Sequence, residues 1–333
     1  MRFKWIYILL IILVVLYFLG PAPASPNYNK DMPPVPAQAD SLVDFIRHNE
    51  SLHKLKPDNQ ARIIWANDSL KQKTAYAIVY LHGYTASQGE GDPIHLNIAR
   101  EYGCNLYLSR LAEHGIDTVE ALINFTVDKY WESAKQALAI GKQLGKKVIL
   151  MGTSAGGALA LRLAAEYPGD VDALVLLSPC VAIKDPSAWV LNKRWGVNIA
   201  HLILHSDYVD AKDTLPSEKQ YWDTHVRTES AAQLQEFLAT SMNQKTFEQI
   251  KQPTELLYFY KNEIEQDSTV SVPAMLRMYD ELGTPVALKR KQAMPNTGSH
   301  VICSSIRSHD IKGVQEEIEK FLSGTLGMKT AQP

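Results

Sequence analysis

The sequence predicts an α/β protein with a mostly parallel central sheet and helices on both of its faces. Between residues 74 and 177, short apolar runs of strand length alternate with longer segments of helical spacing. One run, Val148–Met151, leads into Gly-x-Ser-x-Gly at residues 152–156, and a small-residue helix follows at once. From about residue 181 to 250 the alternation stops, and we expect a mostly helical cap.

The other expected elements follow from apolar runs of strand or helix length. Before the cap they are a helix over Ser41–Lys54, an edge strand over Arg62–Ala66, strands over Thr74–Leu81, Asn105–Ser109 and Val171–Leu177, and a helix from about Thr118 to Leu144. After the cap they are a strand over Thr254–Tyr260, a helix over Val272–Leu282, a strand over Val286–Lys291 and a helix over His309–Leu322.

Composition excludes several classes of function. The 333 residues are 46% hydrophobic and 21% charged, which is an ordinary globular balance. A net charge of −2 gives no electrostatic footprint for nucleic acid. The three cysteines are far apart and form no Cys-x-x-Cys pair, so we expect neither a zinc site nor a redox site.

The N-terminus carries a candidate membrane segment. Residues 5–19 contain no charged residue, and Arg2 and Lys4 precede them. The positive-inside tendency would leave these two charges in the cytoplasm. We therefore expect residues 1–20 to be an uncleaved signal-anchor, with the catalytic domain outside the cytoplasm. Secretion after cleavage near residues 22–24 is the alternative.

Six prolines lie between residues 21 and 36. They predict an extended linker over residues 21–40, with no core of its own. The folded domain would then occupy residues 41–333, including the cap at about 181–250.

The turn at residues 152–156 contains the candidate nucleophile. A sharp strand-to-helix turn would strain the backbone of Ser154 and lift its hydroxyl above the sheet. Gly152 and Gly156 leave room where the strand and the helix cross closely. The turn lacks the Gly-Lys-Ser/Thr of a phosphate loop and the Gly-x-Gly-x-x-Gly of a dinucleotide site.

The first buried strand of the alternation is followed by His82 and Gly83. A glycine at this place lets the backbone turn back towards the end of the sheet. The N–H of Tyr84 could then point at the space above Ser154, opposite the N–H of Ala155. We predict that these two amides form an oxyanion hole, and an ordinary strand-exit turn is the alternative.

A serine nucleophile needs a base, and the base needs an orienting acid. With this type of turn, the chain order is serine, then acid, then histidine. His300 lies in a polar loop directly after the last strand, whereas His309 begins the final helix, so we predict His300 as the base. Asp267, in the loop after the preceding strand, is the predicted acid, and Glu263 is the alternative. Two further carboxylates are weaker candidates: Glu265 and Asp185.

These motifs resemble those of the α/β-hydrolase superfamily over about residues 60–325. In addition, Arg-Leu-Ala-Glu-His-Gly at residues 110–115 is similar to the Arg-Leu-x-Gly-His-Gly of the monoacylglycerol lipase, carboxylesterase and serine aminopeptidase branch. Here Glu113 replaces the usual glycine of that branch. The resemblance implies an α/β-hydrolase fold with a helical cap after the sixth strand, and no metal or organic cofactor. It implies the same triad: Ser154, His300 and Asp267.

The expected activity is hydrolysis of a carboxylic ester through an acyl-enzyme intermediate. An apolar acyl ester, either a small molecule or a lipid, is favoured because the cap is rich in aromatic residues and residues 5–19 would reach a membrane. The alternatives are a serine peptidase or aminopeptidase, a thioesterase, and a non-catalytic binding module. An acidic cluster that holds a peptide amine would favour the aminopeptidase, and the available residues are Glu113, Glu229, Glu236 and Glu248.

Overall fold

The structure is a computed structural model that describes residues 2–211 and 214–331. Within these residues the central sheet has seven strands in the order β1-β3-β2-β4-β5-β8-β9. Every neighbouring pair is parallel except β1 and β3, which confirms the mostly parallel sheet. The strands are β1 (Arg62–Ile64), β2 (Thr74–Leu81), β3 (Asn105–Leu108), β4 (Gly145–Thr153), β5 (Ala173–Leu177), β8 (Thr254–Tyr258) and β9 (Lys289–Ala293).

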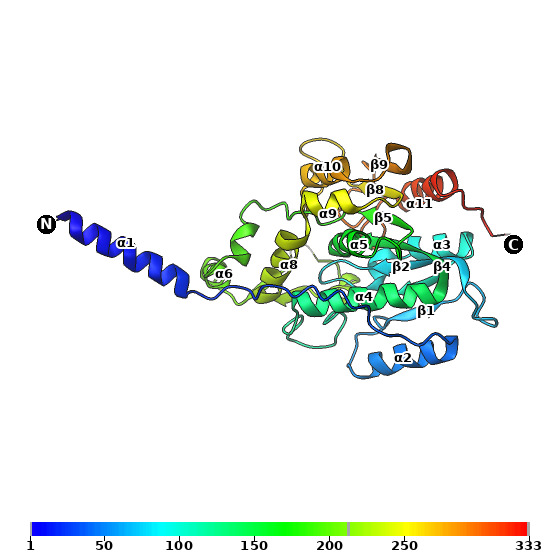
Figure 1. Cartoon of the computed structure of the whole chain (residues 1–333), viewed down its shortest axis with the longest axis horizontal. Helices are drawn as coiled ribbons and strands as arrows, with labels where there is room; N and C mark the ends of the chain where they lie inside the picture. Colours follow the sequence, from blue (N-terminus) through cyan, green and yellow to red (C-terminus); the bar gives the residue numbers. More distant parts are fainter. Residues whose placement is uncertain (1, 212–213, 332–333) are drawn as a thin grey trace.

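Helices cover both faces of the sheet (Figure 1). One face packs against α2 (Ala39–Ser51), α4 (Val127–Leu144), α5 (Ala155–Glu166), α9 (Gln244–Gln249) and α10 (Val272–Glu281). The other face packs against α3 (Ile94–Glu101), α11 (Ile311–Lys320) and a π-helical turn at Phe321–Thr325. Along β2, Val79 joins the first core and Ile78 joins the second. Burial on both sides explains why β2 is almost continuously apolar.

Some element boundaries differ from the prediction. The helix expected from Thr118 starts at Val127, because Thr126 caps it by accepting a hydrogen bond from the N–H of Lys129. The strand expected over Val286–Lys291 starts three residues later, after a 3₁₀ turn at Val286–Leu288. The first domain helix starts before Ser41, with Gln38 at its N-cap.

The insertion over residues 181–250 is mixed rather than purely helical. It contains an antiparallel ribbon of two three-residue strands, too short to show alternation in the sequence. The insertion follows β5, which is the fifth strand of the described sheet and not the sixth, because only β1 precedes β2. Its elements are a 3₁₀ turn (Ala188–Asn192), α6 (Gly196–Leu204), β6 (Tyr208–Asp210), α7 (Glu218–Tyr221), β7 (His225–Arg227) and α8 (Thr228–Ser241), with α9 at its end.

The N-terminal helix α1 (Arg2–Leu19) projects away from the rest of the molecule (Figure 1). Within residues 2–211 and 214–331, we find no helix that combines the length and the apolar content needed to cross a membrane. Residue 1 of the expected anchor lies outside the described residues.

The proline-rich segment after α1 has no helix or strand before α2, and it lies against the domain. The indole N–H of Trp131 donates to the carbonyl of Asn29 at 2.9 Å, and Lys135 donates to the carbonyl of Asp31 at 2.7 Å. Tyr28 packs against the core shared by α4 and α5. The segment therefore follows the surface of α4 instead of bridging open solvent.

Candidate active site

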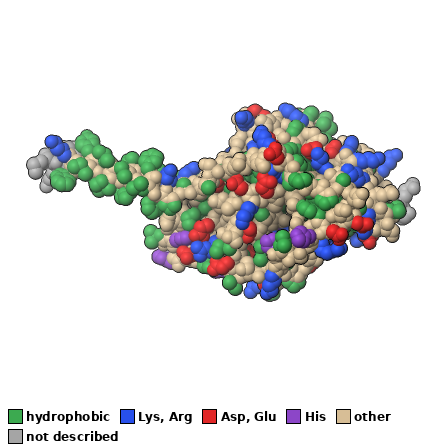
Figure 2. All heavy atoms as spheres, turned by 60° about the horizontal axis from the view of Figure 1, so that its bottom comes forward, with side chains coloured by type: hydrophobic (Ala, Val, Ile, Leu, Met, Phe, Trp, Pro, Cys, Tyr) green, Lys and Arg blue, Asp and Glu red, His purple; other side chains and the backbone are tan. Residues whose placement is uncertain are grey.

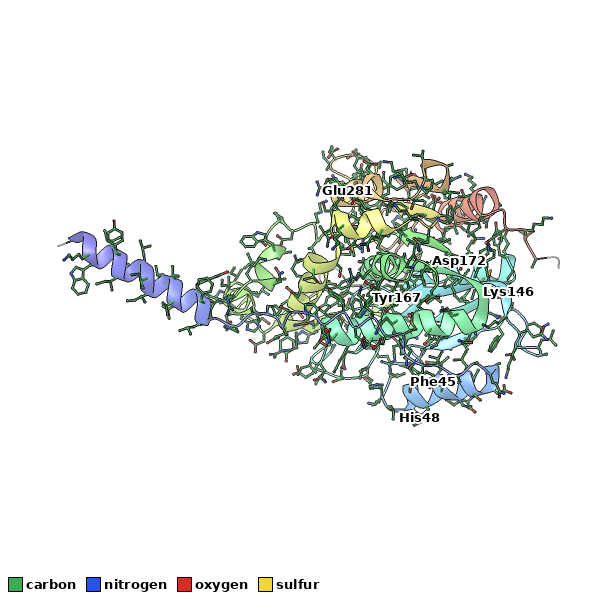
Figure 3. All side chains as sticks on the ribbon, viewed as in Figure 1. Phe45, His48, Lys146, Tyr167, Asp172 and Glu281 are labelled. Carbon is green, nitrogen blue, oxygen red and sulfur yellow. The ribbon has the colours of Figure 1, made fainter. Side chains whose placement is uncertain are left out.

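The predicted site residues lie at one edge of the sheet. Ser154 follows β4, Asp267 follows β8 and His300 follows β9, and these strands are parallel, so their carboxyl ends meet at this edge. Figure 3 labels Lys146 and Asp172 near the amino ends of β4 and β5, at the far side of the sheet from α1 and the cap. The site therefore lies under the cap.

The turn at Ser154 has the expected strained geometry. Ser154 has φ 53° and ψ −120°, a conformation that L-residues with a side chain rarely adopt. Its N–H donates to the carbonyl of Leu177 at the end of β5, at 3.0 Å. A Cβ on Gly156 would overlap the carbonyl of Leu81, and a Cβ on Gly152 would meet the carbonyl of Gly156 at 2.6 Å. Glycine at both positions therefore lets the turn form against β2.

Asp267 and His300 form a direct pair. Nδ1 of His300 lies 2.6 Å from Oδ2 of Asp267, which is fully buried. The other carboxylate oxygen accepts hydrogen bonds from the N–H groups of Thr269 (2.8 Å) and Val270 (2.9 Å). Burial alone would raise the pKa of Asp267, but the His300 charge and these hydrogen bonds outweigh it and lower the pKa.

The geometry assigns the tautomer of His300. Because Asp267 is ionised, it accepts a hydrogen bond from the Nδ1–H of His300, which leaves Nε2 free to act as an acceptor. Nε2 is buried and has no hydrogen-bond partner within the described part of the chain. Burial lowers the pKa of His300, whereas the nearby charges of Asp267 and Glu90 raise it, and the net shift is upward.

The rival acids have other partners. Glu263 accepts from the hydroxyl of Tyr260, and Asp185 accepts from Ser187. Glu265 pairs with Lys261 on the surface. Among the candidate acids, the structure brings Asp267 to His300.

The two predicted oxyanion amides belong to the residue after Ser154 and to the loop at the end of β2. Ala155 is the first residue of α5, and Tyr84 follows Gly83 at the end of β2. Within residues 2–211 and 214–331, neither amide donates a hydrogen bond to the protein. The side chain of Tyr84 is fixed separately, because its hydroxyl lies 2.6 Å from that of Ser230 in the cap.

His82 holds the loop that carries Tyr84. Its Nδ1 lies 3.0 Å from the carbonyl of Gly83, and its Nε2 accepts from the N–H of Leu111 at 3.0 Å. Burial and the neighbouring His114 lower the pKa of His82 well below its usual value. A neutral ring can accept at one nitrogen and donate at the other, so His82 joins two loops of the site.

Sequence reasoning missed Glu90, a buried carboxylate beside the predicted nucleophile. Its Oε2 accepts from the N–H of Gly83 at 2.6 Å and from the hydroxyl of Tyr80 at 3.3 Å. A Cβ on Gly83 would lie 2.7 Å from Oε1 of Glu90 and 3.1 Å from Cβ of Ser154, so both side chains flank this glycine. Burial raises the pKa of Glu90 to about 7. Its only signal in the sequence is an acid between two glycines.

A cavity of about 480 Å³ lies beside His300, between the cap and the domain. Its lining is mainly polar and includes the hydroxyl residues Thr85, Thr214, Thr224, Ser268, Thr269 and Ser299. The charged residues at its wall are paired: Glu218 with Arg307, and Asp223 with Lys56 at 2.6 Å. Trp222 adds an aromatic surface. The cavity therefore offers neutral hydrogen-bonding groups rather than an apolar slot.

The Arg-Leu-Ala-Glu-His-Gly segment supports the site from outside. Arg110 makes a two-point ion pair with Glu50 of α2, at 2.7 and 3.0 Å. Glu113 has φ 67°, in the left-handed region, and pairs with Lys129 at 2.9 Å. Glycine adopts this conformation without strain, so the position explains why a related motif carries glycine there.

Comparisons with known proteins agree with the topology. The model of the serine aminopeptidase family S33 matches residues 125–280. A solved structure of the metagenome-derived lipolytic enzymes LipS and LipT has 15% identity and a TM-score of 0.65, and the alignment covers 81% of this chain and 99% of that one. The search of curated proteins found no match.

Two further solved structures are similar over the same extent. The monoacylglycerol lipase of Paleococcus ferrophilus has 17% identity and a TM-score of 0.58, with 79% of this chain and 97% of that one covered. Est1E of Butyrivibrio proteoclasticus, with ferulic acid bound, has 16% identity and a TM-score of 0.53, with 80% and 95% covered. Sheet order, the turn at Ser154 and these comparisons together show that the chain has the α/β-hydrolase fold.

Proposed function

We propose that this hydrolase is a serine esterase, with Ser154 as nucleophile, His300 as base and Asp267 as acid. The observation that carries the proposal is the buried pair of Asp267 and His300, whose free Nε2 lies at the same sheet edge as the strained Ser154. A serine hydroxyl is a weak nucleophile unless a neighbouring base removes its proton.

The reaction would proceed in two halves. Nε2 of His300 accepts the hydroxyl proton as Ser154 attacks the ester carbonyl, and Asp267 stabilises the imidazolium that forms. The amides of Tyr84 and Ala155 donate to the developing oxyanion. His300 then gives its proton to the leaving alcohol. In the second half it activates water, which releases the acid from Ser154.

The substrate that we propose is a small ester with a polar part next to the scissile bond. Lipases and esterases among the similar structures support a small-molecule ester. The sequence favoured an apolar acyl group, but the cavity beside His300 is lined by hydroxyl groups. We therefore assign this cavity to the more polar portion of the ester.

The aminopeptidase alternative has less support. The acids that could hold a peptide amine have other partners: Glu113 with Lys129, Glu229 with Arg227, Glu236 with Asn192 and Glu248 with Gln244. The acids at the cavity wall, Glu218 and Asp223, are also paired. A free carboxylate, which an ammonium group requires, is not offered by these side chains.

We further propose that residues 1–20 anchor the enzyme to a membrane, with the hydrolase domain outside the cytoplasm. The support is the uncharged stretch at residues 5–19 and the preceding basic residues. Secretion after cleavage remains the alternative.

The test of the triad is labelling of the full chain with a fluorophosphonate, followed by turnover of esters and aminoacyl amides. The wild type should be labelled and Ser154→Ala should not. Ser268→Ala, a serine of the cavity wall, should keep its label and serve as the control. A folded wild type that resists labelling would favour the binding module. Faster turnover of aminoacyl amides than of esters would favour the peptidase.

A further inference from the structure

Cap helix α6 presents an apolar surface to the outside. Leu202 is 73% exposed, Ile203 is 71% exposed and Ile199 is also exposed. Their spacing of three and four residues puts them on one side of the helix. The opposite side of α6 packs against α8, and His201 is partly buried there. Contiguous apolar side chains at an exposed surface mark a contact with another apolar body.

The end of α1 is attached to the start of α6. Arg194 donates to the carbonyls of Phe18 (2.9 Å) and Gly20 (2.8 Å), and the indole of Trp195 donates to the carbonyl of Leu16 at 2.9 Å. The N–H of Trp195 also donates to the carbonyl of Pro21 at 2.8 Å. These bonds satisfy carbonyls that a helix end leaves unpaired. The indole also occupies the space where a Cβ on Gly20 would lie, so the chain passes close to the cap.

The exposure of α1 indicates which kind of partner contacts the apolar surfaces of α1 and α6. Every residue from Trp5 to Leu19 is between 46% and 73% exposed, so the helix is apolar and uncovered on all sides. Figure 2 shows hydrophobic side chains along the projecting helix on the face in view. A second copy of the chain would cover one side of such a helix. A lipid layer surrounds it completely, and helices that are apolar all round are typical of a lipid environment.

The residues at the junction fit the boundary of a lipid layer. Lys193 and Arg194 lie where α1 meets the cap, and Trp189 and Trp195 flank them with exposed rings. Tryptophan is enriched at membrane–water interfaces, and basic side chains there attract anionic headgroups.

We infer that α6 lies in the surface of the same lipid layer that takes up α1. Leu202 and Ile203 then contact acyl chains, while Arg194 and Trp195 lie at headgroup level. The cap, and the cavity beneath it, face the membrane. This inference rests on the proposed membrane anchor and on the junction of α1 and α6, and it does not depend on the triad.

The experiment places an environment-sensitive fluorophore on Ile203→Cys in the full chain, bound to vesicles of phosphatidylcholine and phosphatidylglycerol. The three native cysteines are buried, so the new thiol is the accessible one. We expect emission to shift to shorter wavelength and to be quenched by spin-labelled lipid. Val286→Cys is the control and should show neither effect, because Val286 is 84% exposed in the 3₁₀ turn that precedes β9.

Each other outcome overturns the inference. Emission typical of water at position 203 in vesicle-bound protein would show that α6 stays above the lipid. A shift without vesicles that grows with protein concentration would identify a second copy as the partner. Failure of the full chain to float with vesicles would remove the lipid surface altogether.

A second pair of variants tests the surface without a label. Leu202→Asp with Ile203→Asp should lower the fraction of protein bound to vesicles, because charged groups do not enter acyl chains. Val286→Asp should leave binding unchanged. Hydrolysis of a water-soluble ester should be the same in both variants, and equal binding of both to vesicles would contradict the inference.

Discussion

The sheet edge that carries the proposed triad and the cap are built in opposite ways. At the edge, Asp267 is fully buried and Ser154 and His300 are nearly so. Each of them follows the end of a strand, and glycines leave room for the turn at Ser154. The cap consists of short helices and a three-residue ribbon, with exposed apolar side chains on α6. Under the proposed function, the sheet would fix the chemistry, while the cap would determine what reaches the site and from which side.

The largest effect should come from Asp267→Asn, at the rigid edge. Turnover should fall roughly 10⁴-fold, because the amide favours the wrong tautomer of His300. The charge of Asp267 raises the pKa of His300, so its removal should move the acidic limb of the pH–rate profile to lower pH. Glu263→Gln, which alters a surface acid of the same loop, is the control. If Glu263→Gln causes the loss instead, the assignment of the acid is wrong.

Glu90→Gln tests whether the buried carboxyl group of Glu90 lowers the stability of the fold when it is ionised. The pKa of Glu90 rises from an ordinary 4.5 to about 7, so the folded state holds a proton that the unfolded state releases. Stability should therefore fall as pH rises from 4.5 to 7 and level off above, by ~3 kcal/mol at most. Glutamine still accepts from Gly83 and has no charge to bury. The variant should gain about 1–3 kcal/mol over the wild type at pH 8 and little at pH 4.5.

Urea unfolding of both proteins at the two pH values measures this difference. An equal difference at pH 4.5 and pH 8 would mean that Glu90 titrates normally. The same variant should also lower the pKa of His300, since Glu90 contributes to raising it.

The cap should respond through binding rather than through chemistry. Trp222→Ala removes the aromatic wall of the cavity and should lower kcat/KM. The expected loss of transition-state stabilisation is about 1–2 kcal/mol. Labelling of Ser154 by a small fluorophosphonate should continue at the wild-type rate. Comparison of the turnover rate with the labelling rate distinguishes substrate binding by the cap from the reactivity of Ser154. Equal losses in both rates would show that the cap also positions the triad.

The smallest effect concerns Glu113, at φ 67°. Glu113→Gly should relieve backbone strain of ~1 kcal/mol, partly offset by loss of the half-exposed pair with Lys129. Gly115→Ala is the matched opposite, because it adds a Cβ at φ 68°, 2.9 Å from that of Asn59, and should destabilise. Thermal unfolding measures whether each variant is more or less stable than the wild type. Destabilisation by Glu113→Gly would show that the ion pair outweighs the strain.

The sequence predicted the central strands of the sheet well because β2, β3, β4, β5 and β8 are largely buried on both faces. Thr74–Leu81 has the predicted bounds, since a continuous apolar run bounded by polar residues leaves little choice. Ser154, Asp267 and His300 could be selected from the sequence because each of them follows a predicted strand. The two-stranded ribbon in the cap was not predicted, because strands of three residues are too short to show alternation of apolar and polar residues. Glu90 escaped because its burial depends on Gly83 and Tyr80, which meet it only in the folded chain.

The buried cysteines have a consequence for the redox chemistry of the protein. Burial raises the pKa of each thiol, Cys104, Cys180 and Cys303, to about 12. Thiolate is the form that reacts with disulfides and oxidants, and at neutral pH almost none is present. If the proposed anchor places the domain in an oxidising compartment, these three cysteines can therefore stay reduced without any reducing partner.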